Sequence, residues 1–175
     1  MRFSPGIKTP AFLADDIYGK TQFPEKYMGQ KWMLSFFRYA SCPLCNFRVN
    51  QLIQHYDRWQ TEGFNILAIF ESSGESIKKY VGKQAVPFPI IPDPELDLYR
   101  KYHVESSWIK YILGAFTFIK AVFHGFIPGK MEGDKAIVPA DFLINEDGTI
   151  HTAYYGNNIG DHIPIELINE FIHNY

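Results

Sequence analysis

Cysteine is scarce in this sequence, because the 175 residues contain only two, Cys42 and Cys45. So few thiols exclude the disulfide-dense scaffold of small secreted domains. No second Cys-x-x-Cys pair completes the four ligands of a structural zinc site, and the six histidines are scattered without the spacing of metal ligands. We therefore expect no metal site and no bound cofactor.

An excess of charge of either sign is also missing. The formal net charge is −2 and the acidic and basic residues are interspersed, so nucleic acid is not an expected partner. The sequence has no apolar signal segment after Met1, and we expect a cytoplasmic location. In a reducing compartment a static disulfide has little use, so a Cys-x-x-Cys motif there favours catalysis.

A continuous apolar run of membrane-spanning length is absent as well. The stretch from Trp108 to Phe126 is long and apolar, but Gly114 and two lysines interrupt it, so a membrane span is not expected. We expect a buried helical insertion near residues 104–135. A homodimer contact, a lid beside the cysteines and attachment to a membrane surface are the alternatives.

The sequence does contain a regular alternation of strand and helix patterns. Hydrophobic residues make up 46% of the chain, enough to bury the core of a single domain over residues 1–175. A Pro- and Gly-rich N-terminal extension precedes a central mixed sheet flanked by helices, the order typical of an α/β fold. The predicted strands are 32–37, 64–70, a short edge strand within 84–94 and a hairpin over 136–155, and the predicted helices are 43–60, 72–83, 95–102 and 165–173.

Both cysteines lie where a strand pattern changes to a helix pattern. Pro43 suits the first position of the helix, which places Cys42 at the N-cap beside unpaired backbone donors. Those donors and the helix dipole stabilise a thiolate, so Cys42 is predicted to be the exposed attacking sulfur. Cys45, one turn into the helix, is predicted to be more enclosed and to act as the resolving sulfur.

Other charged residues near this junction are candidates for influencing the two thiols. Arg38 follows the strand and Arg48 lies one turn beyond Cys45, and either can add a positive field. Glu71, after the next strand, is a weak candidate for the proton acceptor of Cys45 and is expected to be a solvated carboxylate. Two buried structural thiols or a zinc site are the alternative interpretations of the cysteine pair.

Three local motifs together resemble the thioredoxin-like fold, in its peroxiredoxin-like AhpC/TSA branch. They are the strand running into Cys42-Pro-Leu-Cys45, the hairpin Pro139-Ala-Asp-Phe-Leu-Ile-Asn-Glu-Asp-Gly148, and the Pro10-Ala-Phe start. Pro139 lacks the N–H of a central strand residue and should begin its strand. The resemblance implies that Pro139 is a cis-proline lying against the cysteine turn, with the Val138 backbone free to pair with a substrate.

The sequence differs from the resembled families in their supporting residues. Aligning the peroxide-attacking cysteine with Cys45 places Cys42 at a threonine and Arg38 at a proline, and a second arginine falls on Pro139. The two-arginine peroxide cradle is therefore not expected. The buried acid of thioredoxins falls on Phe36.

The leading functional hypothesis is a thiol-disulfide oxidoreductase that alternates between a Cys42/Cys45 dithiol and a disulfide. The alternatives are a peroxidase that reduces hydroperoxides and, in another class, a thioredoxin-like binding module without turnover. The resemblance implies a disulfide or peroxide substrate and a thiol reductant, such as a thioredoxin or a low-molecular-weight thiol.

Overall fold

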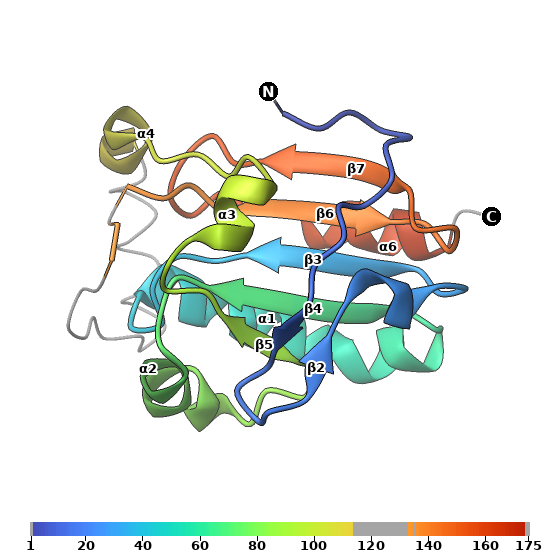
Figure 1. Ribbon diagram of the computed structural model, residues 1–175, viewed down its shortest axis with the longest axis horizontal. Helices are drawn as coiled ribbons and strands as arrows, with labels where there is room; N and C mark the ends of the chain where they lie inside the picture. The colour runs from blue at the N-terminus through green and yellow to red at the C-terminus, as the bar shows by residue number, and fades with distance from the viewer. Residues whose placement is uncertain (1, 114–132, 135, 174–175) are drawn as a thin grey trace.

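The fold is centred on one mixed sheet. A computed structural model describes residues 2–113, 133–134 and 136–173 (Figure 1). Within these residues, a five-stranded sheet has the order β5-β4-β3-β6-β7. Its strands are β3 (Trp32–Phe36), β4 (Asn65–Phe70), β5 (Ile90–Pro92), β6 (Ala140–Ile144) and β7 (Ile150–Tyr155).

Strand β3 lies at the centre of this sheet and has a different pairing on each side. It runs parallel to β4 and antiparallel to β6, where Ser35 is opposite Asp141 and Phe36 is opposite Ala140. The C-terminal end of β3 therefore lies beside the N-terminal end of β6. This register brings Pro139, which precedes β6, next to the segment that leads from β3 to the cysteines.

Helices cover both faces of the sheet. Helices α1 (Pro43–Thr61) and α6 (Ile165–His173) lie behind the sheet in Figure 1, and α3 (Asp97–Lys101) lies in front of it. Alternate residues of β3 enter the two cores: Met33 belongs to the same buried cluster as Val49 of α1, whereas Leu34 belongs to the cluster that contains Tyr99 of α3. Burial on both faces explains the nearly continuous apolar strands. Ser73 is the N-cap of helix α2 (Gly74–Tyr80), and its Oγ accepts a hydrogen bond from Ser76 N–H at 3.3 Å.

The predicted N-terminal extension is confirmed by its hydrogen bonds to the sheet. It contains the two short strands β1 (Ala14–Asp15) and β2 (Thr21–Gln22) and the 3-10 helix η1 (Pro24–Tyr27). Gly6 N–H donates to Ile150 O at 2.8 Å, and Ile17 N–H donates to Ile90 O at 2.9 Å. The extension therefore contacts both edge strands. A second 3-10 helix, η2 (Gly82–Gln84), follows α2.

The predicted insertion is described only at its start, as α4 (Trp108–Leu113). Trp108, Ile109 and Ile112 are 61%, 75% and 69% exposed, so the expectation of a buried helix is wrong for this part. Lys110 of the same helix donates instead to Glu105 Oε1 and to Gly156 O, just after β7. Residues 114–132 lie outside the described residues, and the homodimer, lid and membrane-surface interpretations of that stretch fall there.

Candidate active site

The two cysteines lie at the turn between β3 and α1, as the sequence predicted. Cys42 is the N-cap residue of α1, with φ −70° and ψ 122°, and Pro43 is at the first helical position. Proline there costs no hydrogen bond, because the first N–H groups of a helix have no partner within it. Cys45 follows one turn later, and both cysteines are free thiols.

Both thiols are buried. Cys42 is 0% exposed and Cys45 is 1% exposed, so the expectation that Cys42 is the exposed sulfur is wrong. Arg38, itself 1% exposed, donates to the Cys42 sulfur, and its guanidinium lies 5.1 Å from the ring of Tyr39 and 5.5 Å from the ring of Tyr111. The contact with Tyr111 is tertiary, which is why the helix pattern alone did not reveal it.

Their surroundings shift the pKa values of the two thiols in opposite directions. Burial opposes the Cys42 thiolate, but a hydrogen bond from the Cys45 thiol, the charge of Arg38 and the backbone N–H groups at the start of α1 outweigh it. The pKa of Cys42 is thereby lowered to about 6, whereas burial and the same hydrogen bond raise the pKa of Cys45. A thiolate beside a protonated thiol is the arrangement that an attacking and a resolving sulfur need.

Of the two arginines considered, the structure brings only Arg38 to the thiolate. Its Nη1 donates to Cys42 Sγ at 3.4 Å. Arg48 lies on α1 but its Nη2 donates to Ile163 O at 2.7 Å, on the segment before α6. The positive field predicted for this turn therefore comes from Arg38.

Glu71 is a buried acid rather than the solvated carboxylate that we expected. It is 3% exposed, and its Oε1 accepts a hydrogen bond from Asp134 N–H. Burial raises the pKa of Glu71 to about 7, opposed by that hydrogen bond and by the charge of Arg38. This carboxyl group therefore titrates near neutral pH, close enough to Arg38 to feel its charge.

Sequence analysis missed a second polar cluster, centred on Asp141. This fully buried carboxylate accepts hydrogen bonds from Ser35 Oγ, from His162 Nδ1 at 3.0 Å and from Ile163 N–H at 2.8 Å. Burial opposes its charge, but His162 and Arg48 hold the pKa of Asp141 below its ordinary value. The available signal was an aspartate within the otherwise apolar strand 140–144.

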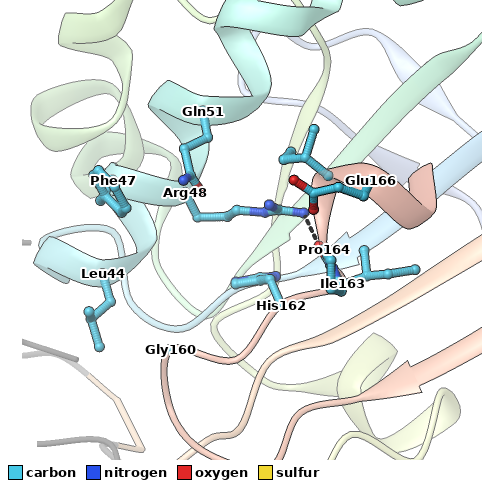
Figure 2. Close-up of a pocket in the computed structure, with 10 residues that line it drawn as sticks. Leu44, Phe47, Arg48, Gln51, Gly160, His162, Ile163, Pro164 and Glu166 are labelled. Carbon is cyan, nitrogen blue, oxygen red and sulfur yellow. Dashed lines mark hydrogen bonds between the residues drawn. The ribbon is translucent and has the colours of Figure 1, made fainter. Parts of the chain in front are cut away.

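A pocket of about 310 Å³ opens beside this cluster (Figure 2). Leu44, Arg48 and Gln51 of α1 form one wall, and His162, Ile163 and Glu166 before and at the start of α6 form the other. We call it the α1–α6 pocket. Because Leu44 lies between the two cysteines in the chain, the pocket is adjacent to the thiol turn.

Comparisons with known proteins agree with this geometry. The sequence model of the AhpC/TSA family matches residues 5–153. The chain belongs to the AhpC/TSA family. It is 25% identical over 162 residues to the Mycobacterium tuberculosis protein named "Putative peroxiredoxin Rv2521", covering 93% of this chain and 91% of that protein. Family membership makes the chain a thiol-dependent oxidoreductase.

Solved structures confirm the thioredoxin-like fold of this AhpC/TSA protein. Peroxidoxin BcpB from Mycobacterium tuberculosis matches with a TM-score of 0.68 at 11% identity, over 96% of this chain and 93% of that one. The thioredoxin domain of a Bacteroides vulgatus thiol-disulfide oxidoreductase matches with a TM-score of 0.59 at 15% identity, over 98% and 99% of the two chains. The family implies a thiol reductant and a peroxide or disulfide substrate.

The AhpC/TSA resemblance predicted the Val138–Pro139 wall incorrectly in two respects. The described residues contain no cis peptide bond, so the bond before Pro139 is trans. Val138 N–H donates to Glu105 O at 3.0 Å and is not free for a substrate chain. Pro139 does precede its strand as predicted, and its carbonyl accepts from Gly156 N–H at 2.9 Å.

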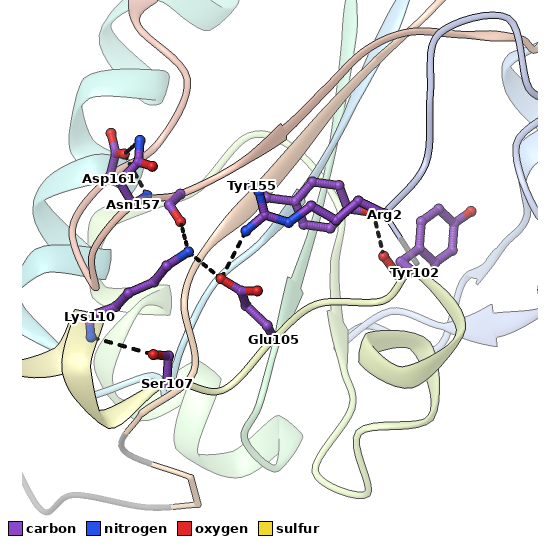
Figure 3. Close-up of polar contacts among 9 residues, drawn as sticks. Arg2, Tyr102, Glu105, Ser107, Lys110, Tyr155, Asn157 and Asp161 are labelled. Atoms are coloured by element: carbon purple, nitrogen blue, oxygen red, sulfur yellow. Dashed lines mark hydrogen bonds and ion pairs between the residues drawn. The ribbon is translucent and has the colours of Figure 1, made fainter.

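Residue Glu105 is itself fixed in the structure (Figure 3). Its carboxylate forms ion pairs with Arg2, at 3.0 Å, and with Lys110. Lys110 Nζ also donates to Gly156 O at 2.8 Å, which ties α4 to the end of β7. The segment of Glu105, whose backbone carbonyl accepts the hydrogen bond from Val138 N–H, is therefore held by contacts from three parts of the chain.

Two searches of the described residues gave negative results. Among residues 2–113, 133–134 and 136–173, no group of three or more His, Cys, Asp or Glu side chains is placed to hold a metal ion. In the same part of the chain, no helix combines the length and the apolar character that crossing a membrane requires.

Proposed function

We propose that this AhpC/TSA protein is a dithiol–disulfide oxidoreductase in which Cys42 attacks and Cys45 resolves. The observation that carries the proposal is the opposite shift of the two thiols within one helical turn. Arg38, 3.4 Å from the Cys42 sulfur, and the Cys45 thiol stabilise a thiolate at Cys42, whose pKa is about 6. At neutral pH the attacking sulfur is then ionised while the resolving sulfur keeps its proton.

The proposed reaction has two exchange steps. The Cys42 thiolate attacks one sulfur of a substrate disulfide, the substrate S–S bond breaks, and the released thiolate takes a proton from water. Cys45 loses its proton and attacks Cys42, which forms the Cys42–Cys45 disulfide and releases the second substrate thiolate. The substrate is reduced by two electrons, and two thiols of an external reductant restore the dithiol.

The proton of Cys45 needs an acceptor, and Glu71 is our candidate. Its pKa of about 7 lets the carboxylate accept a proton at neutral pH. Tyr99, whose hydroxyl donates to Phe37 O at 2.5 Å, feels the charges of both Glu71 and Cys45. Glu71 and Cys45 therefore both lie near enough to the buried Tyr99 to influence its ionisation.

The burial of the site favours small substrates. Cys42 is 0% exposed, and the Val138 N–H that a peptide would pair with is already bonded to Glu105. A low-molecular-weight disulfide needs neither a docking strand nor a wide opening. We propose such a disulfide as substrate and a thioredoxin or a low-molecular-weight thiol as reductant, in a single domain over residues 1–175. A reducing compartment such as the cytoplasm suits this cycle, and a homodimer is compatible with it.

Peroxidase activity is the second candidate, favoured by the enclosed Cys42 thiolate and its bond to Arg38. Here the thiolate attacks one peroxide oxygen, the O–O bond breaks, and water leaves after taking a proton. The Cys42 sulfenic acid then condenses with the Cys45 thiol, which releases a second water and gives the same disulfide. The enclosed site admits hydrogen peroxide more readily than a larger substrate.

One comparison of rates separates these candidates from a binding module without turnover. We would measure consumption of bis(hydroxyethyl) disulfide and of hydrogen peroxide by the wild type, Cys42→Ser and Cys45→Ser. The proposal expects disulfide turnover that Cys42→Ser abolishes, and reaction with peroxide no faster than that of a free thiol. Fast peroxide consumption would establish the peroxidase instead, and two unreactive thiols of high pKa would favour the module.

A further inference from the structure

The α1–α6 pocket contains a buried cation that the fold leaves largely unpaired. Arg48 is 6% exposed, and a guanidinium carries five N–H donors. Among the described residues, the hydrogen bond of this guanidinium is the one from Nη2 to Ile163 O at 2.7 Å, and its buried Nε has no partner. No ion pair of Arg48 is found in this part of the chain either.

His162, on the opposite wall of the pocket, has a second buried polar atom without a hydrogen-bond partner among the described residues. The His162 side chain is 5% exposed, and its Nδ1 faces Asp141 at 3.0 Å. Its Nε2 is buried without a hydrogen-bond partner among the described residues. Figure 2 shows Arg48 reaching from α1 across the pocket towards Glu166, with the His162 ring below it in this view.

Asp141 and Glu166 favour the charge of Arg48 from a distance, but among the described residues neither carboxylate forms a hydrogen bond or an ion pair with it. The oxygens of Asp141 already accept from Ser35, His162 and the Ile163 N–H. Glu166 is exposed to solvent, which screens its charge. Burying a charge without a paired group is costly, so an occupied pocket is the better-paired state of this protein.

We propose that the α1–α6 pocket binds the carboxylate group of a small molecule through the Arg48 guanidinium. A carboxylate offers the acceptors that the open N–H groups lack, and Arg–carboxylate pairs form strong charge-assisted hydrogen bonds. The apolar wall of Leu44, Phe47 and Ile163 suits a short aliphatic chain. A volume of about 310 Å³ is at the lower end of the range for ligand pockets, which excludes a bulky partner.

Neither cysteine lines the pocket, but its position next to the cysteine turn suits a site for one end of a substrate. Leu44 lines the pocket and lies between Cys42 and Cys45, so a molecule held there rests against the redox turn. This part of the inference rests on the proposed function. It names the substrate class as a low-molecular-weight disulfide that carries a carboxylate, reduced by the two exchange steps given above.

Two synthetic disulfides of similar length test the specificity. Dithiodipropionate carries a carboxylate at each end, whereas bis(hydroxyethyl) disulfide is uncharged. A charge-assisted hydrogen bond of roughly 1.5 kcal/mol or more corresponds to about a tenfold or larger preference in kcat/KM for dithiodipropionate. Equal kcat/KM values for the two disulfides in the wild type would overturn the carboxylate specificity while leaving the proposed function intact.

Variants of the pocket walls should change that preference in opposite directions. Gln51→Glu adds a negative charge and should reduce the preference by about threefold, whereas Glu166→Gln removes one and should increase it by about twofold. Gln51 is partly exposed and Glu166 is exposed, so both variants should fold, whereas removing the buried Arg48 could unfold the protein. Lys78→Gln, an exposed charge change on α2, is the matched control and should leave the ratio unchanged. If the ratio of the kcat/KM values for the two disulfides is the same in Gln51→Glu, Glu166→Gln and the wild type, the assignment to this pocket is wrong.

Binding can also be measured without turnover. Suberate has the length of dithiodipropionate without its disulfide, and octanediol is its neutral counterpart. Calorimetric titration of the Cys42→Ser, Cys45→Ser double variant should show saturable binding of suberate that Gln51→Glu weakens, and no binding of octanediol. Absence of suberate binding would overturn the inference. Suberate binding in a protein that turns over neither disulfide would keep the carboxylate site and refute both the proposed function and the substrate role of the pocket.

Discussion

The Arg38 guanidinium donates from Nη1 to the sulfur of Cys42 at 3.4 Å, and both side chains are almost fully buried. A positive charge in a medium of low dielectric stabilises a nearby thiolate strongly. The thiolate in turn gives a buried guanidinium the partner it needs. Together with the hydrogen bond from the Cys45 thiol and the backbone N–H groups, this pair makes Cys42 the acidic thiol of the turn.

Replacing Arg38 by methionine should therefore raise the pKa of Cys42. The wild-type thiolate should form with a midpoint of about pH 6. Loss of the charge should move the midpoint upward by about one unit or more, followed as thiolate absorbance in the ultraviolet. Arg58→Gln, at an exposed arginine paired with Glu62, is the control and should leave the midpoint in place. An unchanged midpoint in Arg38→Met would show that the backbone and Cys45 suffice.

Removing the resolving sulfur should trap the first intermediate. In Cys45→Ser, the Cys42 thiolate can still attack a disulfide, but no second thiol releases the product, so a mixed disulfide should accumulate. Intact-protein mass spectrometry should detect one substrate half per chain, which a reductant removes. Cys42→Ser should form no such adduct, and an adduct at Cys45 in that variant would reverse the assigned roles.

Glu71 should make stability depend on pH. Its pKa of about 7 in the folded protein lies above the ordinary 4.5, so its favourable contribution is complete below about pH 4.5 and is lost as the pH rises through 7. Glu71→Gln keeps an oxygen for the Asp134 N–H and does not titrate. As the pH rises from about 5 to about 8, the Tm of Glu71→Gln should therefore increase relative to the Tm of the wild type. A difference that is independent of pH would contradict the raised pKa.

Asp141 should contribute strongly to stability. Asp141→Asn replaces a carboxylate that accepts from Ser35, His162 and Ile163 N–H, and it removes a charge that faces Arg48. We expect a loss of about 3 kcal/mol in the free energy of unfolding, measured by urea denaturation. Asp57→Asn, at an exposed position of α1, should stay within about 0.5 kcal/mol of the wild type. A small loss for Asp141→Asn would mean that its partners find water instead.

Gly156 leaves no room for a side chain at the end of β7. A Cβ there would lie 2.4 Å from Asp161 O and 3.1 Å from Pro139 O. Gly156→Ala should therefore cost about 1–3 kcal/mol in the free energy of unfolding, through backbone displacement. Gly74→Ala is the matched control, because its Cβ would meet Ile17 Cγ2 at 4.0 Å, an ordinary contact. It should be neutral or slightly stabilising in α2.

The elements with local signals were predictable from the sequence. Pro43 at the first position of α1, the two apolar runs of β6 and β7, and Gly148 with φ +79° in their turn are each specified by a few neighbouring residues. Such signals depend on backbone geometry and on residue period, which one stretch of chain contains. The same local information placed Cys42 and Cys45 together at the strand-to-helix turn.

The surroundings of the thiols depend on contacts between distant residues. Arg38, which donates to Cys42, also lies against the ring of Tyr111, far along the chain, and no local rule fixes that contact. Glu71 becomes buried through Asp134, and a hydrogen bond to Glu105, far along the chain, occupies the Val138 N–H. Each of these contacts depends on which segments the sheet order places side by side.

The sequence by itself therefore determined the order of elements, the AhpC/TSA resemblance and the position of the dithiol. Only the tertiary structure decided which arginine serves the thiolate, since Arg38 lies against Cys42 while Arg48 faces the α1–α6 pocket. Both arginines flank the cysteines at similar distances along the chain. Packing separates them, because a guanidinium on a long side chain goes where aromatic rings, carbonyl oxygens and other charges are assembled around it.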